Sequence, residues 1–351
     1  MTPDAQSLRS RLSGDRTGFP ATIRWLLAVC GALIVGGGLL ALVGADPVAA
    51  YVEMVQGTFG SLFNLGLVLT EMVPLLVIGL GLVISFRARV WNIGAEGQFM
   101  FGALAGGAFA LHAPIGSQFV AIPAVLIVGS FAGALWGLLV AIARVRWQVN
   151  EVISSLLLNY VALFVFAYAV RKPLRDPGGF KPTSERIPDQ FVLADFPIDR
   201  IRVHIGIIVA LALVPAVVFL VNRSPFGMRS SMFGLNPEAT KAAGVNTSGL
   251  IVRVMILSGA FAGLAGIIQV LGSELRLSNN MSTGYGFTAI VVALIARLRP
   301  VGVVLASALL GALTLGGDVI QRTQQVPRVL TMVIQAVFVL FLLLADRARK
   351  T

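Results

Sequence analysis

A series of long apolar segments is the feature that most constrains this chain. Ten of them follow one another along 351 residues. Most approach the ~20 apolar residues that a helix needs to cross a hydrocarbon core of ~30 Å. None shows the ten-residue alternation of a membrane β-barrel strand. The sequence therefore predicts an all-α, polytopic integral membrane protein with about ten transmembrane helices in a single transmembrane domain, residues 21–346. The segments are residues 22–44, 61–86, 95–112, 117–143, 151–170, 204–222, 251–273, 284–298, 301–320 and 328–345.

Composition supports the same class. Hydrophobic residues make up 57% of the chain and charged residues 12%, with a mean hydropathy of +0.88, whereas about a quarter of the residues in a soluble domain are charged. The single Cys30 lies in the first apolar segment and excludes a disulfide framework. We expect no metal site and no cofactor. The first segment is too long for a secretory signal, so residues 1–20 are interpreted as a disordered, basic cytoplasmic tail before an uncleaved anchor.

Basic residues near the ends of the apolar segments predict the orientation. With both termini cytoplasmic, most of the 27 Lys and Arg residues fall in cytoplasmic segments, which include 223–250 and the C-terminal residues 347–351. The long loop 171–203 is then extracytoplasmic, and its basic residues are balanced by acidic ones. Its prolines indicate irregular structure, while the apolar residues Phe180, Phe191, Val192, Leu193 and Phe196 suggest some packing. The net charge of +11 is explained by this bias and by attraction to anionic lipid. Nucleic acid is not expected as a partner, because the charges are scattered.

The segment Trp91–Gln98 places polar residues at the start of a short apolar stretch. Asn92, Glu96 and Gln98 would be costly at membrane depth without a structural or functional reason. They either cap a helix at the cytoplasmic surface or belong to a broken segment that lines a solute path, since irregular backbone at membrane depth survives only beside protein or a water-filled cavity. The second interpretation is favoured.

Two further patterns point to a translocator. Segments 95–112 and 284–298 are both short and interrupted by glycine at their start, and they would correspond if the chain were an inverted repeat of five plus five spans. Such a pair is a pointer to a binding site near the membrane midplane. Glycines spaced by four, at 129, 133 and 137 and again at 259 and 263, predict close helix packing.

The cytoplasmic segment 223–250 contains a strongly capped short helix. Asn236 suits an N-cap, Pro237 the first helical position and Glu238 the first turn, and Gly244 suits the end. It is either a plain connector or a docking helix for a cytoplasmic partner, and the amount of capping chemistry favours docking.

Several of these stretches resemble known permeases. Glu238-Ala239-Thr240 with Gly244 is similar to the EAA loop of ATP-binding cassette (ABC) importer permeases, although Thr240 replaces an alanine and the hydrophobic–proline ending of that loop is absent. Residues 92–98, 151–160 and 284–288 resemble the branched-chain amino acid, ribose and nucleoside permease family, and the first two are most similar to its nucleoside and simple-sugar branch.

The resemblance implies one permease subunit of an importer in the bacterial cytoplasmic (inner) membrane. It implies pairing with a second permease, either a copy or a paralogue, together with two ABC ATPase subunits and an extracytoplasmic solute-binding protein. The chain has no phosphate-binding Gly-x-x-x-x-Gly-Lys-[Ser/Thr] loop, so it is not expected to be an enzyme. The ATPase contacts are expected at Asn236, Pro237, Glu238, Ala239, Lys241 and Gly244.

Polar and aromatic residues within the spans are the candidates for the path. Amides and hydroxyls could bind the hydroxyls of a nucleoside or sugar while an aromatic ring, such as Phe99, stacks on an apolar face. Each residue alone is also compatible with a structural role. A secondary transporter or channel is the alternative function, and a membrane enzyme is a third. The candidates are Glu71, Asn92, Glu96, Gln98, Asn159, Gln269, Asn280, Tyr285, Phe287 and Thr288.

Overall fold

The computed structural model describes residues 21–196, 201, 203–281 and 284–347. The expected cytoplasmic tail, residues 1–20, and nearly all of the C-terminal segment 347–351 lie outside the described residues. Within the described ranges every regular element is a helix, and extended pairing is limited to isolated β-bridges. The prediction of an all-α fold is confirmed.

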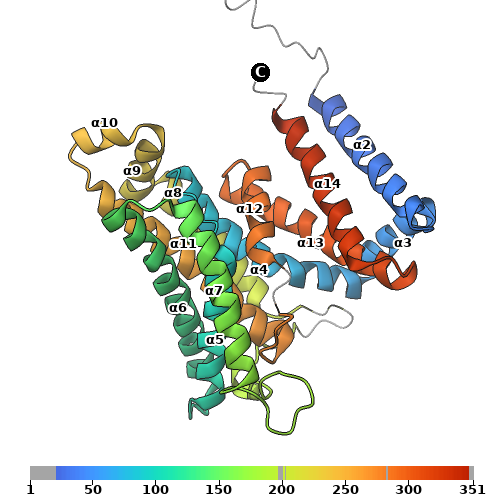
Figure 1. Ribbon diagram of the computed structural model, residues 1–351, viewed down its shortest axis with the longest axis horizontal. Coiled ribbons are helices and arrows are strands. Elements are labelled where there is room, and N and C mark those ends of the chain that lie inside the picture. Colours follow the sequence, from blue (N-terminus) through green and yellow to red (C-terminus); the bar gives the residue numbers. More distant parts are fainter. Residues whose placement is uncertain (1–20, 197–200, 202, 282–283, 348–351) are drawn as a thin grey trace, which may run out of the picture. The chain divides into compact units, whose positions relative to one another are not determined.

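The helices follow the apolar segments closely, and Figure 1 shows their arrangement. Two additional short helices, α3 and α9, were not predicted. The elements are α2 (Ala21–Leu42), α3 (Pro47–Phe59), α4 (Leu62–Arg87), α5 (Ala95–His112), α6 (Gln118–Trp147), α7 (Glu151–Arg171), η1 (Asp189–Phe191), α8 (Gly206–Asn222), α9 (Pro225–Leu235), α10 (Pro237–Ala242), α11 (Thr247–Gln269), the π-turn η2 (Val270–Glu274), α12 (Tyr285–Ile295), α13 (Pro300–Thr323) and α14 (Arg328–Arg347).

Seven of the described helices are long and apolar enough to cross a membrane, and an eighth is added if α8 and α9, bent by 63°, form one broken span. The protein is therefore a multi-pass membrane protein. The predicted segments 95–112 and 284–298 form the two helices α5 and α12, and α12 has only 11 residues.

The chain divides into two compact units. One contains residues up to Ser61 and from Leu313 onward, and the other contains Leu62 to Ala312. In the first unit, the Tyr51 hydroxyl of α3 donates to the Leu33 carbonyl oxygen of α2 at 2.7 Å. A small core of Leu40, Ala50, Ile320 and Val326 holds α2, α3 and the end of α13 together.

The second unit is built around α4 and α11, its most buried helices. Glycine allows α6 and α11 to approach each other closely: a Cβ on Gly133 would lie 2.6 Å from the Cα of Gly263, and a Cβ on Gly137 would lie 2.7 Å from the Met255 carbonyl oxygen. Small residues at such a contact bring backbones together and increase van der Waals packing. The glycine pattern in the sequence therefore correctly indicated close packing.

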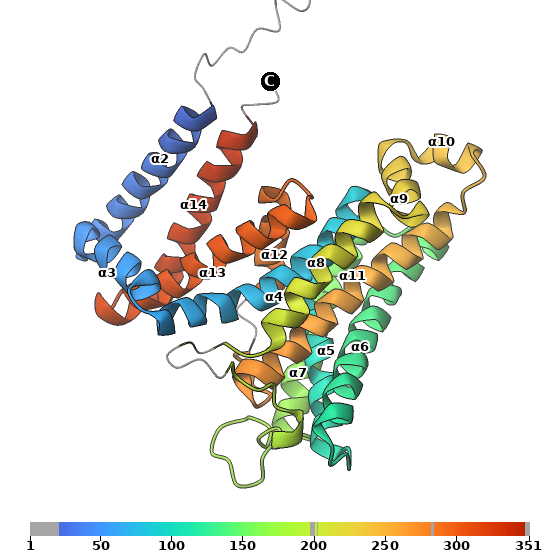
Figure 2. The ribbon, with the colours of Figure 1, turned by 180° about the vertical axis from the view of Figure 1, so that it is seen from behind.

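Two re-entrant connections lie within this unit, and Figures 1 and 2 show both. After α4 the chain turns back through the irregular segment 88–94, with turns at 88–89 and 93–94, before α5 begins. After α11 and η2 it turns back again through residues 275–281 toward α12. In both views, α5 leads toward the end of the unit that carries loop 171–196, while α12 leads toward the end that carries α9 and α10.

Loop 171–196 packs on the second of these connections. The amides of Ser184, Ile187 and Leu193 donate to the carbonyl oxygens of Leu277, Leu275 and Leu271 at 2.9, 2.9 and 3.0 Å. Arg276 Nη1 also lies 3.2 Å from Asp176 Oδ2. Ile187, Phe191 and Leu193 of the loop are buried, whereas Phe180, also expected to pack, is fully exposed. The described part of the loop is thus ordered by packing and backbone bonding, without regular helix beyond η1.

Candidate functional site

The two short helices meet at their N-termini. The Gly286 amide of α12 donates to Glu96 Oε2 of α5 at 2.7 Å. A side chain at Gly286 would overlap the backbone of Ala95 and Glu96. The residue before α12, Gly284, has a φ of +91° and provides no side-chain cap. Helix N-termini leave amides unsatisfied and favour a negative charge, so Glu96 supplies a cap to a helix other than its own.

Tyr285 extends this junction to α4. Its hydroxyl donates to Glu71 Oε2 at 2.9 Å, and its ring centroid lies 5.6 Å from that of Phe99. Tyr285 and Phe99 are buried. The predicted residues Glu71, Glu96 and Tyr285 therefore come together at one junction of α4, α5 and α12.

Asn92 and Gln98 form a second, fully buried polar group beside the start of α5. Asn92 Nδ2 donates to Gln98 Oε1 at 2.8 Å and to Ser258 Oγ of α11 at 2.9 Å. Gln98 Nε2 donates back to Asn92 Oδ1 at 3.1 Å, and the same oxygen accepts from the Gly94 amide. Buried amides that form several hydrogen bonds fix a single geometry. Both predicted residues thus hold the return segment in place.

Asn159 of α7 fixes the same segment from another direction. Its Oδ1 accepts from the Gly97 amide at 2.8 Å, and its Nδ2 donates to the Ile93 carbonyl oxygen at 2.9 Å. The side chain is 6% exposed. One amide therefore satisfies a donor and an acceptor that the break before α5 would otherwise leave unpaired.

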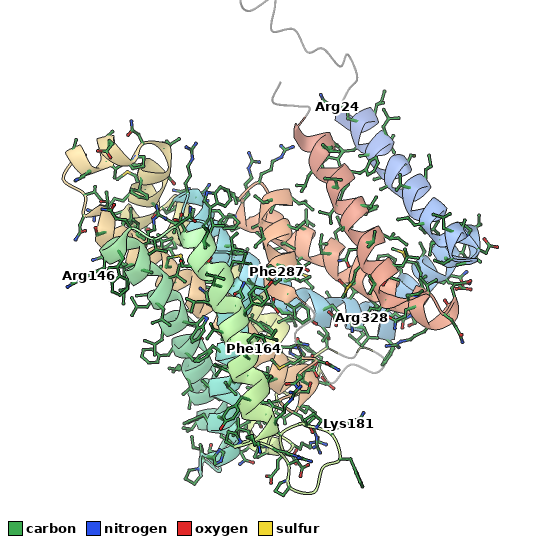
Figure 3. The ribbon with its side chains drawn as sticks, in the orientation of Figure 1. Arg24, Arg146, Phe164, Lys181, Phe287 and Arg328 are labelled. Carbon is green, nitrogen blue, oxygen red and sulfur yellow. The ribbon has the colours of Figure 1, made fainter. Side chains whose placement is uncertain are left out.

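The remaining predicted path residues lie around the junction with fewer polar contacts. Phe287 is 43% exposed on α12, and Figure 3 labels it there. Thr288 is half-buried, and Asn280 is exposed in the return segment before α12. Gln269 is buried at the end of α11, where its Oε1 has no hydrogen-bond partner among the described residues.

Two residues near the site were missed by sequence reasoning. Ser258 accepts from Asn92, and its position on an otherwise apolar helix was an available signal. Trp136 stacks on Phe101 with centroids 3.9 Å apart. A Cβ on Gly97 would lie 3.0 Å from Trp136 Nε1. Nothing in the local sequence of Trp136 indicated this contact, because it joins α6 to the first turn of α5.

The short capped helix predicted within residues 223–250 is present as α10. Asn236 Oδ1 accepts from the Ala239 amide at 3.0 Å, and Pro237 occupies the first helical position. Gly244 has a φ of +79°, a conformation that glycine adopts at little cost. Glu238, Ala239 and Lys241 are exposed, whereas Thr240 is buried. The unpredicted α9 precedes α10 and is capped in the same way, by Ser224 followed by Pro225.

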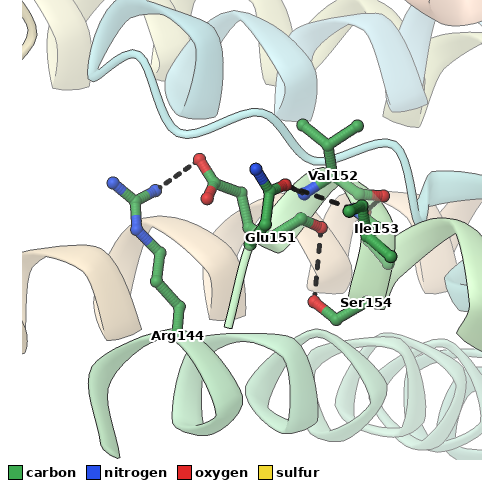
Figure 4. A network of polar contacts seen from close by, with 7 residues as sticks. Arg144, Glu151, Val152, Ile153 and Ser154 are labelled. Atoms are coloured by element: carbon green, nitrogen blue, oxygen red, sulfur yellow. Dashed lines mark hydrogen bonds and ion pairs between the residues drawn. The ribbon is translucent and has the colours of Figure 1, made fainter. Parts of the chain in front are cut away.

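The turn between α6 and α7, which carries another of the quoted sequence patterns, is also firmly held. Figure 4 shows Arg144 Nη1 of α6 paired with Glu151 Oε1 at 2.7 Å. Asn150 caps α7 by accepting from the amides of Val152 and Ile153. The pair is partly buried, with side chains 23% and 14% exposed, so it is better protected from solvent than a surface ion pair.

Comparison with known proteins agrees with this architecture. A family described as the permease component of the branched-chain amino acid transport system matches residues 64–343. The chain is 36% identical over 331 residues to a glucose ABC transporter permease protein of Haloferax volcanii, covering 92% of this chain and 87% of that protein. It is 33% identical over 326 residues to a guanosine ABC transporter permease protein of Bacillus subtilis, covering 90% and 91%.

A nucleoside ABC transporter permease protein of Lactococcus lactis is 26% identical over 320 residues, covering 89% of this chain and 88% of that protein. No solved structure matches the chain significantly. The family match covers both short helices, the polar groups around them and the α9–α10 segment. This chain belongs to the permease-component family of branched-chain amino acid transport systems.

Proposed function

We propose that this protein is the membrane-spanning permease subunit of an ATP-driven importer and forms the path for a nucleoside or simple sugar. The relatives at 36%, 33% and 26% identity are permeases of ABC transporters for glucose, guanosine and nucleosides. They favour an ABC permease over a secondary transporter or channel. The observation that carries the proposal is the meeting of two broken segments at Glu96 and Gly286.

Irregular backbone at membrane depth is stable where protein or a water-filled cavity satisfies it. In this protein Asn92, Gln98 and Asn159 satisfy the break before α5, and Glu96 satisfies the start of α12. We assign these four side chains to the shape of the path. We assign the remaining candidates to contact with the solute. They are Tyr285, Phe287, Thr288 and Asn280, together with Glu71, which bonds to Tyr285, and Gln269 at the end of α11.

That set suits a neutral polar solute. Hydroxyl and amide groups can bind the hydroxyls of a sugar ring, while an aromatic face packs on its apolar side or on a base. The carboxylates of Glu71 and Glu96 already accept hydrogen bonds from Tyr285 and Gly286. A solute without charge needs no further counter-ion in such a site.

We further propose about ten spans in an inverted five-plus-five repeat that forms one permease domain, residues 21–346. The sequence of long helix, return segment and short helix occurs twice, as α4–α5 and as α11–α12. Both termini and the 223–250 loop are placed in the cytoplasm and loop 171–203 outside. Figure 3 is compatible with this, since Arg146 and Lys181 lie at opposite ends of the second unit.

The proposed assembly places ATP hydrolysis in separate subunits, with this chain having no catalytic residue or cofactor of its own. The exposed face of α10, with Glu238, Ala239 and Lys241, is the expected contact with the ATPase. A second permease, either a copy or a paralogue, and an extracytoplasmic solute-binding protein complete the importer in the cytoplasmic membrane.

Reconstitution tests this proposal. The permease, with the ATPase, second permease and binding protein that copurify with it, is placed in liposomes, and uptake of guanosine, other nucleosides and glucose is measured. We expect uptake only when ATP is present on the side of the membrane that carries the ATPase and the binding protein is present on the opposite side. Uptake driven by an ion gradient without any ATPase would establish the alternative function instead.

A further inference from the structure

A polar cavity of about 530 Å³ lies where α8 bends into α9, away from the junction of the short helices. It is bounded by the last residue of α4, the last residues of α8 and one face of α9. Its walls include two arginines and two serines, with Val221, Asn222 and Met228 completing most of the lining. The residues that matter here are Arg87, Asn222, Arg223 and Ser231.

The cavity is positively charged and has no carboxylate in its lining. Arg87 Nη1 donates to the neutral Asn222 Oδ1 at 2.8 Å. The guanidinium group of Arg223 makes no hydrogen bond or ion pair with any other residue in the ranges that the structure describes, and only its backbone amide is bonded, to the Phe219 carbonyl oxygen. The positive charge of Arg299 also acts on Arg87. Arg87 is half-buried and Arg223 is exposed at this open cavity. Neighbouring cations repel one another, so an anion that enters the cavity is stabilised.

The position of the cavity at the end of α4 places it within reach of lipid headgroups. Arg87 ends α4, a helix long and apolar enough to cross a membrane, and Asn222 ends α8, which reaches that length only together with the bent helix α9. The end of a spanning helix such as α4 lies at the level of the lipid headgroups. Below Asn222, the exposed residues Ile208, Leu211 and Phe219 follow one face of α8. From residue 208 to 222 this face is about 21 Å long, more than half of the ~30 Å hydrocarbon thickness.

We propose that the cavity binds the phosphate headgroup of an anionic phospholipid, with an acyl chain lying along the Ile208–Leu211–Phe219 face of α8. The guanidinium groups of Arg87 and Arg223 are suited to paired hydrogen bonds with phosphate oxygens. The Ser231 hydroxyl, which has no partner among the described residues, can donate a further bond. Basic pockets between transmembrane helices bind lipid phosphates in this way.

A bound lipid would link the end of α4 to α9. The α4 helix leads directly to the return segment and α5, and α9 leads to α10. The site therefore lies between the solute junction and the proposed ATPase contact without sharing a residue with either.

The test measures lipid retention by the full-length permease in the complex that it forms. The protein is purified in phosphatidylcholine nanodiscs that contain increasing amounts of phosphatidylglycerol, and native mass spectrometry counts the anionic lipids retained. R87Q/R223Q should weaken phosphatidylglycerol retention about tenfold or more, equivalent to about 1.4 kcal/mol. R87K/R223K keeps both charges and should retain most of the binding, which separates loss of the site from loss of folding.

R229Q/R253Q is the matched control, because Arg229 and Arg253 are exposed cations outside the cavity lining. It should leave retention within about twofold of the original protein, well below the tenfold change that 1.4 kcal/mol produces. Inorganic phosphate should compete poorly, because it has no acyl chain to bury on α8.

Three results would overturn the proposal. Retention unchanged in R87Q/R223Q would show that the lipid binds elsewhere. Displacement by inorganic phosphate at the same concentration as the lipid would identify a soluble anion. Loss of copurifying ATPase from R87Q/R223Q with lipid retention intact would show that the cavity receives an acidic protein side chain.

Discussion

Glu96 places a carboxylate in an apolar bundle, and its hydrogen-bond partner belongs to another helix. Because the Gly286 amide donates to it at 2.7 Å, replacing Glu96 affects α12 as well as α5. Glu96→Gln keeps an acceptor of the same size and should lower uptake modestly. Glu96→Ala leaves the buried Gly286 amide unpaired at a cost of about 1–3 kcal/mol and should lower uptake strongly. Transport assays of both variants at equal expression test this, and normal uptake by Glu96→Ala would contradict it.

Substitutions of Tyr285 and Asn280 should affect transport differently from substitutions of Glu96. Because they are assigned to the solute and not to the shape of the path, Tyr285→Phe and Asn280→Ala should change the relative uptake of guanosine, other nucleosides and glucose. Their overall transport should fall less than that of Glu96→Ala. Unchanged preference in both variants would remove the two residues from the site.

His204 is a second residue whose burial has a measurable consequence. It lies before α8, in the loop, and is 1% exposed. Burial lowers its pKa from 6.5 to about 4, against a smaller opposite effect of the nearby Asp195. The unfolded chain therefore binds a proton more readily than the folded one between these values, so folding stability falls as pH falls through this window. Titration of His204 should make the free energy of unfolding about 2 kcal/mol lower at pH 5 than at pH 7.

Thermal unfolding of the purified permease at several pH values measures this effect. His204→Gln removes the titrating group and should make the unfolding midpoint less sensitive to acid between pH 7 and pH 5. His112→Gln is the control, because His112 is exposed at the end of α5. An unchanged acid dependence in His204→Gln would show that other groups cause it.

At the scale of elements, contact between α6 and α11 depends on glycine. A Cβ on Gly133 would lie 2.6 Å from the Gly263 Cα, and neither backbone can move without disturbing a helix that crosses the membrane. Gly133→Val should therefore reduce stability by about 1–3 kcal/mol or more, as overpacking does. Gly116→Ala is the control, since no atom lies within 4 Å of its added Cβ. The yield and melting temperature of folded protein measure the difference, and equal values for both variants would contradict this packing.

The α10 helix is the element proposed to transmit ATPase motion. Glu238→Lys reverses an exposed charge, and Gly244→Val places a β-branched residue at a φ of +79°, where such residues are strained. The double variant should remain in the membrane but lose solute-stimulated ATP hydrolysis. Glu185→Lys, a charge reversal in the exposed part of loop 171–196, should retain it. Undiminished stimulation in the double variant would exclude α10 as the coupling element.

For the whole molecule, the proposed orientation rests on basic residues near helix ends and can be tested by labelling. Lys181 and Lys241 are both exposed, whereas Thr240 beside Lys241 is buried. In a protein whose exposed Cys30 has been replaced, Lys181→Cys should react with an impermeant thiol reagent from outside, and Lys241→Cys should react only after the cells are opened. The reverse pattern would invert the topology.

Local signals in the sequence were sufficient for much of this protein. Apolar length specified the membrane helices, and cap chemistry at Asn236 and Pro237 specified α10. The four-residue glycine spacing indicated close packing on α6 and α11. The same cap signals, Asp46-Pro47 and Ser224-Pro225, precede α3 and α9, so these two helices were also within reach of the sequence.

Only the tertiary structure determined the hydrogen-bond partner of each buried polar residue. Tyr285 donates to Glu71 across 214 residues, and Glu96 accepts from Gly286 across 190. The sequence marked these polar residues as costly in a membrane, since an isolated charge or amide is unfavourable there whatever its neighbours. It could not say which unpaired backbone group each one satisfies, because that depends on which helix ends the folded chain brings together. The sequence alone thus determined the class, most helices and the polar candidates, while packing determined which of those residues satisfy the backbone at the two breaks.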